Sequence, residues 1–549
     1  MTMQVKTVLF LFIVFCCSSG CRQQQRSLFH VFRYNESKGI PSLDPAYARN
    51  QTIIWPVHQI FNGLVQLNDS LRVEPAIASS WEISENGRVY TFFLRDDVWF
   101  HPSPYFKDTT RKVTAEDFVY SFRRILDPDI ASPGSWIFSH VDPDRGFTAL
   151  DAHTLRIWLK EPFPPFLSIL TMPYCSVVPG EVTEALGDDF GSTPVGTGPF
   201  RFRYWNRDEM LVLVKNPAYF ETDSQGNSLP YLDAVNISFI KDKQSEFLEF
   251  MKGNLDFLSG VHPAYKDELL TRSGTLNPEY RDRFRLVTQP YLNTEYLGFL
   301  LDTTRLEADH PLLDIQVRKA INYGFDRSRM MKYLRNNLGY PATAGFIPLG
   351  LEGGLSPGQG YTYRPDHARR LMEEAGYGEG QEMPEITLTT TSDYLDLCEY
   401  IQYELQAIGI NLQIEVATGA SFRNMVANSN LPFFRGSWIA DYADAENYLS
   451  LFYSENFSPA GPNYTHFRSA EYDRLYRMSR SEPDREERLR LYRKMDSIIV
   501  KAAPVVPLYY DVVVRFSPLE IRGLGSNPMN LLVLKSVYRE SHGQGPEPR

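Results

Sequence analysis

The sequence predicts a mixed α/β protein built from several lobes. Its 549 residues are more than one hydrophobic core usually serves, so two or three lobes are expected. Hydrophobic residues make up 43% of the chain and aromatic residues 13%, which is typical of a folded protein. Runs of strand composition alternate along the chain with runs of helical spacing. These three observations indicate a mixed α/β architecture.

The first twenty residues have the pattern of an export signal. Lys6 supplies a positive charge, and residues 8–17 form an apolar run too short to span a bilayer comfortably. Small residues at 18–20 then precede Cys21, which resembles the bacterial lipoprotein signal, in which the cysteine is lipidated and begins the mature chain. We expect residues 1–20 to be removed and Cys21 to hold the protein on a membrane. An ordinary secretory signal with a chance cysteine is the alternative.

The first half of the chain reads as strands around one well-marked helix. Four segments have strand composition: 90–94, 154–159, 211–214 and 234–240. Thr114 and Asp117 have the form of a capping box, with Asp in place of the usual Glu or Gln. The apolar residues that follow recur at helical spacing until Asp127-Pro128. A helix is therefore predicted between the first two strands.

Beyond about residue 290 the pattern becomes strand, helix, strand. Residues 386–390 read as a strand, and alternating apolar residues over 410–416 read as a half-buried strand. The helical stripe between them consists of Leu397, Ile401, Leu405 and Ile408. Such a βαβ unit implies a parallel pair with the helix on one face. Further helices are predicted after Pro365 and over 483–501, and a further strand over 505–516.

Signatures of catalysis are nearly absent. Residues 354–358 match GxSxG, but loop residues flank them, where a nucleophile elbow needs a strand and a helix. There is no P-loop and no HExxH pair, and the ten histidines are scattered. This disfavours a metal site without excluding one assembled from distant residues. The net charge of −11 argues against non-specific nucleic-acid binding. We predict no enzyme and no cofactor.

Two cysteines remain once the signal has left and Cys21 is lipidated. These are Cys175 and Cys398, and nothing in their spacing suggests a disulfide. We expect two buried thiols.

A series of short motifs runs along the chain in a fixed order. They are 42–45 (SLDP), 60–64 (IFNGL), 74–81 (EPAIASSW), 90–95 (YTFFLR), 113–118 (VTAEDF), 196–200 (GTGPF), 216–220 (NPAYF), 317–321 (VRKAI), 325–327 (FDR) and 368–377, which ends in EEAGY. Together they resemble the family-5 solute-binding lipoproteins of ABC importers, which include oligopeptide-, dipeptide- and nickel-binding proteins. The resemblance covers about 42–538, and it is strong because the motifs keep their order.

The resemblance implies a two-lobed periplasmic-binding-protein-like fold of type II, in its large three-region variant, that closes about a hinge. It implies a first lobe made of 21–61, 190–288 and 511–549, with 62–189 as an added subdomain. Residues 289–510 form the second lobe, and the chain crossings between lobes act as hinges. It also implies a monomeric receptor that captures short peptides and delivers them to a membrane permease with cytoplasmic ATPases.

The stretch 433–449 (FFRGSWIADYADAENYL) holds the candidate site. Arg435 and Asp441 are isolated charges in an apolar, aromatic run, and such charges need a partner. In the peptide-binding members that this chain resembles, an acid in a W-x-x-D-Y context pairs with the peptide α-ammonium. Trp438, Asp441 and Tyr442 match that motif. Asp441 pairing with a lysine of the protein, or capping the next turn, is the alternative.

The same resemblance assigns roles to the neighbours of this motif. Arg435, three residues before the tryptophan, is expected to meet the peptide carboxylate. The backbone around Gly436 and Ser437 is expected to pair with the peptide as an added strand. Trp136 and Tyr510 are expected as pocket walls, with core positions as the alternative.

Three departures from the oligopeptide-binding pattern leave ligand length and side-chain preference open. Leu395 replaces a carboxylate-binding histidine, Gly419 stands where a pocket tryptophan is expected, and Arg49 replaces an early acid. Other functions also remain open: capture of a nickel chelate, haem or an oligosaccharide, an exported hydrolase, and a signalling or adhesion lipoprotein. A hydrolase would need a nucleophile–base pair that the sequence does not reveal.

Overall fold

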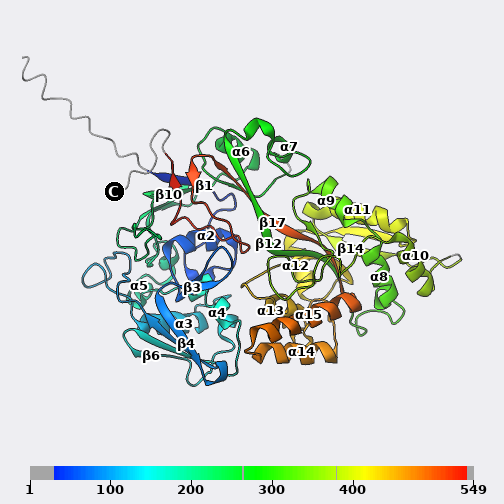
Figure 1. Ribbon diagram of the computed structural model, residues 1–549, viewed down its shortest axis with the longest axis horizontal. Coiled ribbons are helices and arrows are strands. Elements are labelled where there is room, and N and C mark those ends of the chain that lie inside the picture. Colours follow the sequence, from blue (N-terminus) through cyan, green and yellow to red (C-terminus); the bar gives the residue numbers. More distant parts are fainter. Residues whose placement is uncertain (1–29, 263–264, 379, 541–549) are drawn as a thin grey trace, which may run out of the picture.

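The structure is a computed structural model that describes residues 30–262, 265–378 and 380–540. The predicted export signal and Cys21 lie outside these residues. Two α/β lobes lie beside one another and are joined by the long strands β12 (Phe284–Phe299) and β17 (Val505–Pro518) (Figure 1). The predicted two-lobed α/β fold is confirmed.

The first lobe is built on a four-stranded sheet with the order β1-β10-β9-β8. Its strands are β1 (Val31–Asn35), β10 (Ala234–Ser238), β9 (Met210–Lys215) and β8 (Phe200–Asn206). β1 and β10 are parallel and the other pairs antiparallel. The strands predicted at 211–214 and 234–240 are thereby confirmed.

A second sheet, with the order β4-β5-β7-β6, belongs to the predicted subdomain. It contains β4 (Ala78–Ser84), β5 (Val89–Leu94), β7 (Thr154–Trp158) and β6 (Phe147–Asp151). Helix α3 (Ala115–Leu126) packs on β6 and β7. The Asp117 carboxylate accepts a hydrogen bond from the Thr114 N–H at 2.8 Å, so the predicted capping box is present.

The second lobe surrounds a seven-stranded sheet with the order β11-β17-β12-β16-β14-β15, to which β13 adds on β17. The remaining strands of this sheet are β11 (Leu258–Ser259), β13 (Tyr340–Pro341), β14 (Ile386–Thr390), β15 (Leu412–Val416) and β16 (Phe433–Ile439). β14 and β15 are parallel, and α11 (Leu395–Gln406) connects them with its apolar stripe buried. The predicted βαβ unit is confirmed.

Further helices cover the sheets of both lobes (Figure 1). In the first lobe these are α2 (Gln51–Ile60), α4 (Phe166–Ile169), α5 (Gly180–Leu186), α6 (Lys243–Met251) and α7 (Lys266–Leu269). In the second they are α8 (Ile315–Tyr323), α9 (Arg327–Leu334), α10 (Pro365–Glu374), α12 (Gly419–Ala427), α13 (Glu446–Leu449), α14 (Ala470–Ser481) and α15 (Arg485–Ala502). Two short two-stranded sheets complete the structure: β2 (Val65–Leu67) with β3 (Val73–Pro75), and β18 (Ile521–Arg522) with β19 (Tyr538–Arg539).

The connection between the lobes consists of β12 and β17, which pair antiparallel over most of their length. The pairing shifts in register between Pro290 and Thr294, near the middle of β12. The predicted lobe boundaries at 288/289 and 510/511 fall inside these two strands. A register shift interrupts the ladder and lets a strand bend, so this pair is a suitable hinge. The exact lobe boundaries stay a prediction.

Each lobe has its own hydrophobic core, and the two cysteines belong to different cores. Cys175 lies in the core of the first lobe and Cys398 in that of the second, and both are free and fully buried. In the described ranges, no helix is both long and apolar enough to cross a membrane.

Candidate ligand-binding site

Strand β16 offers an open edge between the lobes. One edge pairs with β12 along the whole strand, whereas pairing with β14 is confined, in the described chain, to Phe434. The Ala440 N–H donates to the Leu292 carbonyl at 2.9 Å. Because backbone groups alternate between the two edges of a strand, those of Ser437 and Ile439 point away from β12. An extended ligand can pair with this edge as an added strand.

Gly436 packs directly against the ring of Tyr296 on β12. A Cβ at Gly436 would lie 2.5 Å from the Tyr296 ring, so only glycine fits there without a shift. The alternation that frees Ser437 directs the Gly436 backbone groups toward β12. The sequence predicted that the backbone of Gly436 and Ser437 would pair with a ligand. The register of β16 instead leaves the backbone groups of Ser437 and Ile439 free for such pairing.

Asp441 follows β16 and is held by Asn447. The Asp441 N–H donates to Asn447 Oδ1 at 3.2 Å, and Asn447 Nδ2 donates to Asp441 Oδ2 at 3.3 Å. The Trp438 Nε1–H donates to the same Asn447 Oδ1 at 2.9 Å. One amide thus fixes both the tryptophan and the acid of the motif. No sequence pattern marks Asn447, because its role depends on the turn into α13.

The Asp441 carboxylate lies between the lobes without a countercharge. Its side chain is accessible to solvent, yet desolvation by the surrounding protein raises its pKa. Burial also raises the pKa of Tyr174, Tyr448 and Tyr464, and the charge of Asp441 adds to each shift. Tyr174 belongs to the first lobe. No lysine, arginine or histidine of the described residues forms an ion pair with Asp441. An accessible carboxylate in such surroundings attracts a cation.

Trp136 and Tyr442 meet where the lobes touch. Their ring centroids are 6.2 Å apart, with Trp136 from the subdomain and Tyr442 from the second lobe. Tyr442 is buried and joins the hydrophobic core of the first lobe, whereas Trp136 stays 42% exposed. The residue after Asp441 is therefore part of the contact between the lobes.

Arg435 has a partner inside the protein. It forms a buried ion pair with Glu295 of β12, and its guanidinium lies 3.2 Å from the centroid of the Tyr394 ring. Burial disfavours the charge of Arg435, but Glu295 holds its pKa above the ordinary value. A ligand carboxylate would have to compete with Glu295. The expected contact between Arg435 and a peptide carboxylate stays a prediction, and this arrangement disfavours it.

Arg335 is a cationic residue that sequence reasoning missed. It lies beside the Arg435 pair, 5.6 Å from the ring centroids of both Tyr394 and Tyr509. Its Nε and Nη2 have no hydrogen-bond partner in the described structure. It lines a pocket of about 580 Å³ together with Lys266 and Asp511. These two nitrogens are buried, and the charges of Asp396 and Glu295 already act on Arg335. A ligand carboxylate in the pocket would be a further partner for this guanidinium. An arginine at the end of a polar helix carries no sequence pattern that marks this role.

Tyr510 is a core residue in this structure. It is 1% exposed, packs against Ala342 and Ala344, and donates its hydroxyl hydrogen to the Gly345 carbonyl at 2.7 Å. This burial favours the alternative expected for Tyr510, a core position, and its role as a pocket wall stays a prediction.

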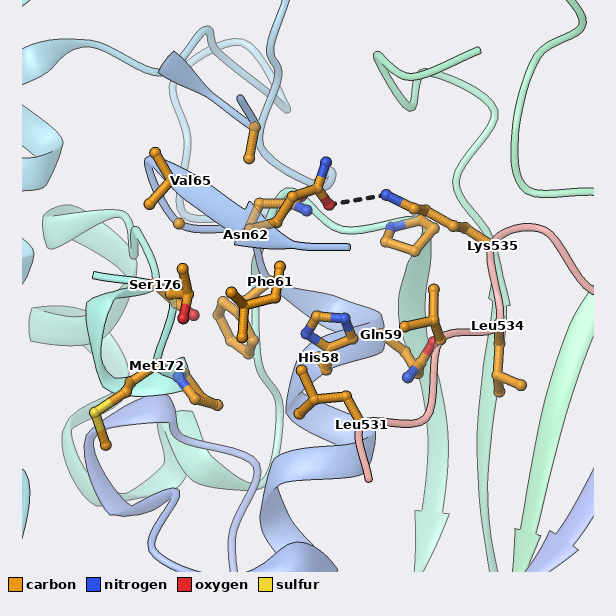
Figure 2. A pocket seen from close by; sticks show the side chains of 18 of the residues that line it. His58, Gln59, Phe61, Asn62, Val65, Met172, Ser176, Leu531, Leu534 and Lys535 are labelled. Carbon is orange, nitrogen blue, oxygen red and sulfur yellow. Dashed lines mark hydrogen bonds between the residues drawn. The ribbon is translucent and has the colours of Figure 1, made fainter. Parts of the chain in front are cut away.

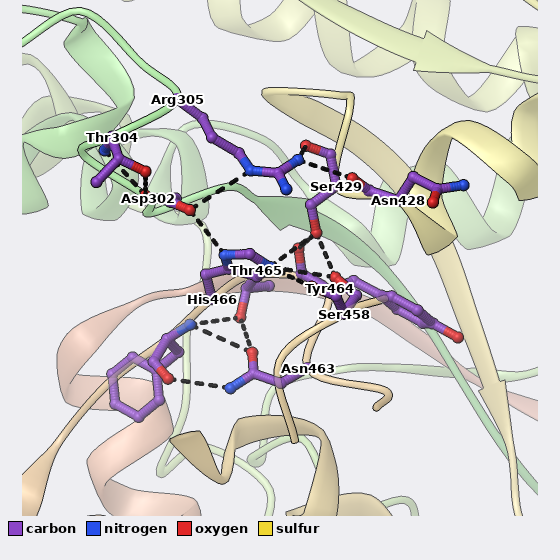
Figure 3. A network of polar contacts seen from close by, with 11 residues as sticks. Asp302, Thr304, Arg305, Asn428, Ser429, Ser458, Asn463, Tyr464, Thr465 and His466 are labelled. Atoms are coloured by element: carbon purple, nitrogen blue, oxygen red, sulfur yellow. Dashed lines mark hydrogen bonds and ion pairs between the residues drawn. The ribbon is translucent and has the colours of Figure 1, made fainter. Parts of the chain in front are cut away.

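A Ser-His-Asp set lies in the second lobe, away from any predicted motif (Figure 3). His466 Nδ1 is 3.0 Å from Asp302 Oδ2, and His466 Nε2 is 3.0 Å from Ser429 Oγ. The same Nε2 is also 3.0 Å from the Ser458 carbonyl. Ser429 is 3% exposed, so its hydroxyl is closed off from solvent in this structure, and the set ties three loops together.

A small cavity inside the first lobe is no ligand site (Figure 2). It measures about 40 Å³, which leaves room for only a few water molecules. Burial and the nearby Lys535 lower the pKa of His58 in its wall to about 4. In the part of the chain that the structure describes, no three metal-ligating side chains come together.

Two hinged lobes with an uncompensated acid and an open strand edge between them define a solute-binding protein. The chain matches the family described as bacterial extracellular solute-binding proteins, family 5 Middle, over residues 72–459, and it belongs to this family.

Three relatives illustrate the range of similar proteins. The dipeptide-binding protein DppE of Bacillus subtilis is 26% identical over 534 residues, covering 92% of this chain and 91% of that protein. The heme-binding protein A of Haemophilus influenzae is 28% identical over 486 residues, covering 85% and 84%. The solved structure of DppA from Helicobacter pylori in complex with the peptide STSA has a TM-score of 0.74 and 27% identity, covering 93% of this chain and 98% of that one.

Proposed function

We propose that this protein captures short peptides between its lobes and delivers them to an ABC permease. The observation that carries the proposal is the Asp441 carboxylate, accessible between the lobes and without a protein countercharge. A free peptide brings an α-ammonium group, which is the charge that this site lacks. Two similar proteins support the proposal: the dipeptide-binding protein DppE, and DppA, whose solved structure holds the peptide STSA.

The peptide would lie along β16. Its α-ammonium group would pair with Asp441, and its backbone with the free groups of Ser437 and Ile439. Its carboxylate would meet Arg335, because Arg435 is occupied by Glu295. The edge from Ile439 to Arg435 spans roughly 13 Å at the usual rise per strand residue, which fits an extended peptide of about three to five residues.

Haem or a metal chelate is the second candidate, since one relative is named a heme-binding protein. Asp441 favours the peptide, because a carboxylate placed to bind an ammonium group has no such group to bind in haem or a metal chelate. The proposed function contains no catalytic step.

We further propose that Cys21 carries a lipid anchor and that the receptor is a monomer; mass spectrometry of the membrane-extracted protein would detect the acyl chains.

Thermal unfolding with free peptides tests the proposal. At a hundredfold excess over Kd, a ligand of the native state adds about 2.7 kcal/mol to the free energy of unfolding. Di- to pentapeptides should therefore raise the melting temperature, with haemin and nickel-histidine as comparison ligands. A flat response across a mixed peptide library, with a shift from either comparison ligand, would overturn the peptide reading.

A further inference from the structure

Arg480 of the second lobe reaches into the first lobe on the side away from the hinge strands. Arg480, near the end of α14, donates from Nη2 to His140 Nδ1 at 3.0 Å. Its guanidinium also forms an ion pair with Glu161 at 3.4 Å and lies 5.5 Å from the centroid of the Phe163 ring. In Figure 1, α14 lies opposite the subdomain that carries these three residues. All three contacts join the two lobes.

The first lobe holds its side of this contact in place. His140 stacks on Phe163 with the ring centroids 3.9 Å apart and the planes 21° from parallel. The Lys160 N–H donates to the His140 carbonyl at 2.9 Å, and Lys160 Nζ donates to the Ser139 carbonyl at 2.8 Å. Arg480 thus meets a contact surface of the first lobe, which we call the latch surface: the ring of Phe163, the Nδ1 lone pair of His140 and the carboxylate of Glu161.

A chain of buried contacts links Arg480 and the latch surface to the ligand site. Glu446 accepts hydrogen bonds from the hydroxyls of Tyr442 and Tyr476. Tyr442 follows Asp441 directly, and Tyr476 lies one turn before Arg480 on α14. Burial raises the pKa of Glu446, and the nearby Arg480 opposes that shift. The segment that bears Asp441 and the helix that bears Arg480 are therefore packed as one unit.

We propose that Arg480 is an interlobe latch, which holds the lobes closed and slows the release of a bound ligand. Opening about the β12–β17 hinge breaks its contacts with His140, Glu161 and Phe163 together, because all three belong to the other lobe. The Arg480–Glu161 pair alone would contribute little, since the two side chains are 24% and 57% exposed. The stacking and the His140 hydrogen bond supply the rest. Closure of the lobes governs release, so the latch acts mainly on the dissociation rate.

The latch is sensitive to pH through His140. Burial, and then the charges of Arg480 and Lys160, lower the pKa of His140 to about 4, while Glu161 is the acid that faces the same guanidinium. Nδ1 accepts a hydrogen bond from Arg480 only when it carries no proton itself, so the imidazole must be neutral. Opening removes Arg480 and part of the burial, so the pKa of His140 rises from about 4 toward its ordinary value. Protonation of His140 therefore favours the open protein, and the latch weakens as the pH falls toward 4.

The test compares Arg480→Ala with Arg477→Ala and the wild type. Arg477 is the matched control: it lies on the same helix but contacts Tyr453 at 3.3 Å and Glu455 at 3.5 Å within its own lobe. Small-angle scattering without ligand should give a larger radius of gyration for Arg480→Ala than for the other two proteins. With trialanine as the probe, stopped-flow release from Arg480→Ala should be about three- to tenfold faster, with association within about twofold.

A His140→Gln variant tests the pH dependence of the release rate, which should not change if His140 only supported the structure. Its release rate should vary less between pH 7 and pH 5 than that of the wild type. The release measurement rests on the proposed peptide function, whereas the scattering measurement does not. If the wild type fails to bind trialanine, scattering alone decides on the latch, and the peptide proposal is decided by the mixed library. Equal radii, with equal release rates where trialanine binds, would overturn the latch.

Discussion

Replacing Asp441 by asparagine removes one charge and keeps the shape of the side chain. An exposed ion pair contributes at most about 1 kcal/mol. Removing one partner of a desolvated charge pair costs roughly 2–5 kcal/mol, part of which is the penalty for the unpaired ammonium. Asp441 is accessible in this structure, and a peptide bound between the lobes would desolvate it, which places the pair in the second kind. Peptide affinity should therefore fall by roughly 2–5 kcal/mol, at least about thirtyfold.

Isothermal titration calorimetry with trialanine at pH 7 measures this loss, and Glu455→Gln serves as a control acid on the surface of the same lobe. The free protein should not be destabilised by Asp441→Asn. A carboxyl whose folded pKa is raised stabilises the fold only below its unfolded pKa and loses that contribution as the pH rises through the folded value, so at pH 7 the wild type bears the cost of the charge. An affinity within a factor of three of wild type, with an unchanged melting temperature, would refute the reasoning.

Three further substitutions probe the rest of the site. Arg335→Met should weaken trialanine by about 1.5–3 kcal/mol while leaving an amidated peptide unaffected; equal losses for both peptides in calorimetry would argue against a carboxylate contact. Asn447→Ala should cost about 1–2 kcal/mol of peptide affinity, because Asp441 loses its orienting amide; no change in Kd would contradict that role. Gly436→Ala should lower the free energy of unfolding by about 1–3 kcal/mol, because its Cβ meets the Tyr296 ring; denaturant midpoints equal to wild type would show that the strand adapts.

The local elements of the fold could be predicted well from the sequence. The parallel pair β14–β15 and the stripe of α11 follow from periodicity over fewer than forty residues. The capping box at Thr114 and Asp117 also depends only on near neighbours in the chain. Such patterns are local, and the tertiary structure agreed with them.

The partners of the site residues could not be predicted, because they come from distant parts of the chain. Arg435 meets Glu295 only because β16 pairs with β12, 140 residues earlier in the sequence. Tyr510 appeared as a pocket wall because an aromatic residue on a strand carries no sign of the face it occupies. Arg335 stood out only through its unused donors, which are a property of the folded protein. Asp441 was found from its motif, and its lack of a countercharge required the structure.

The central claim is that Asp441 binds a free α-ammonium group. The most direct measurement is calorimetric titration of the wild-type protein with trialanine and with N-acetyl-trialanine under the same conditions. Acetylation removes the charge at one end and leaves the carboxylate and the side chains unchanged. The account predicts that the acetylated peptide binds at least about thirtyfold more weakly, a loss comparable to that of Asp441→Asn with the free peptide. Equal affinity for the two peptides would contradict it.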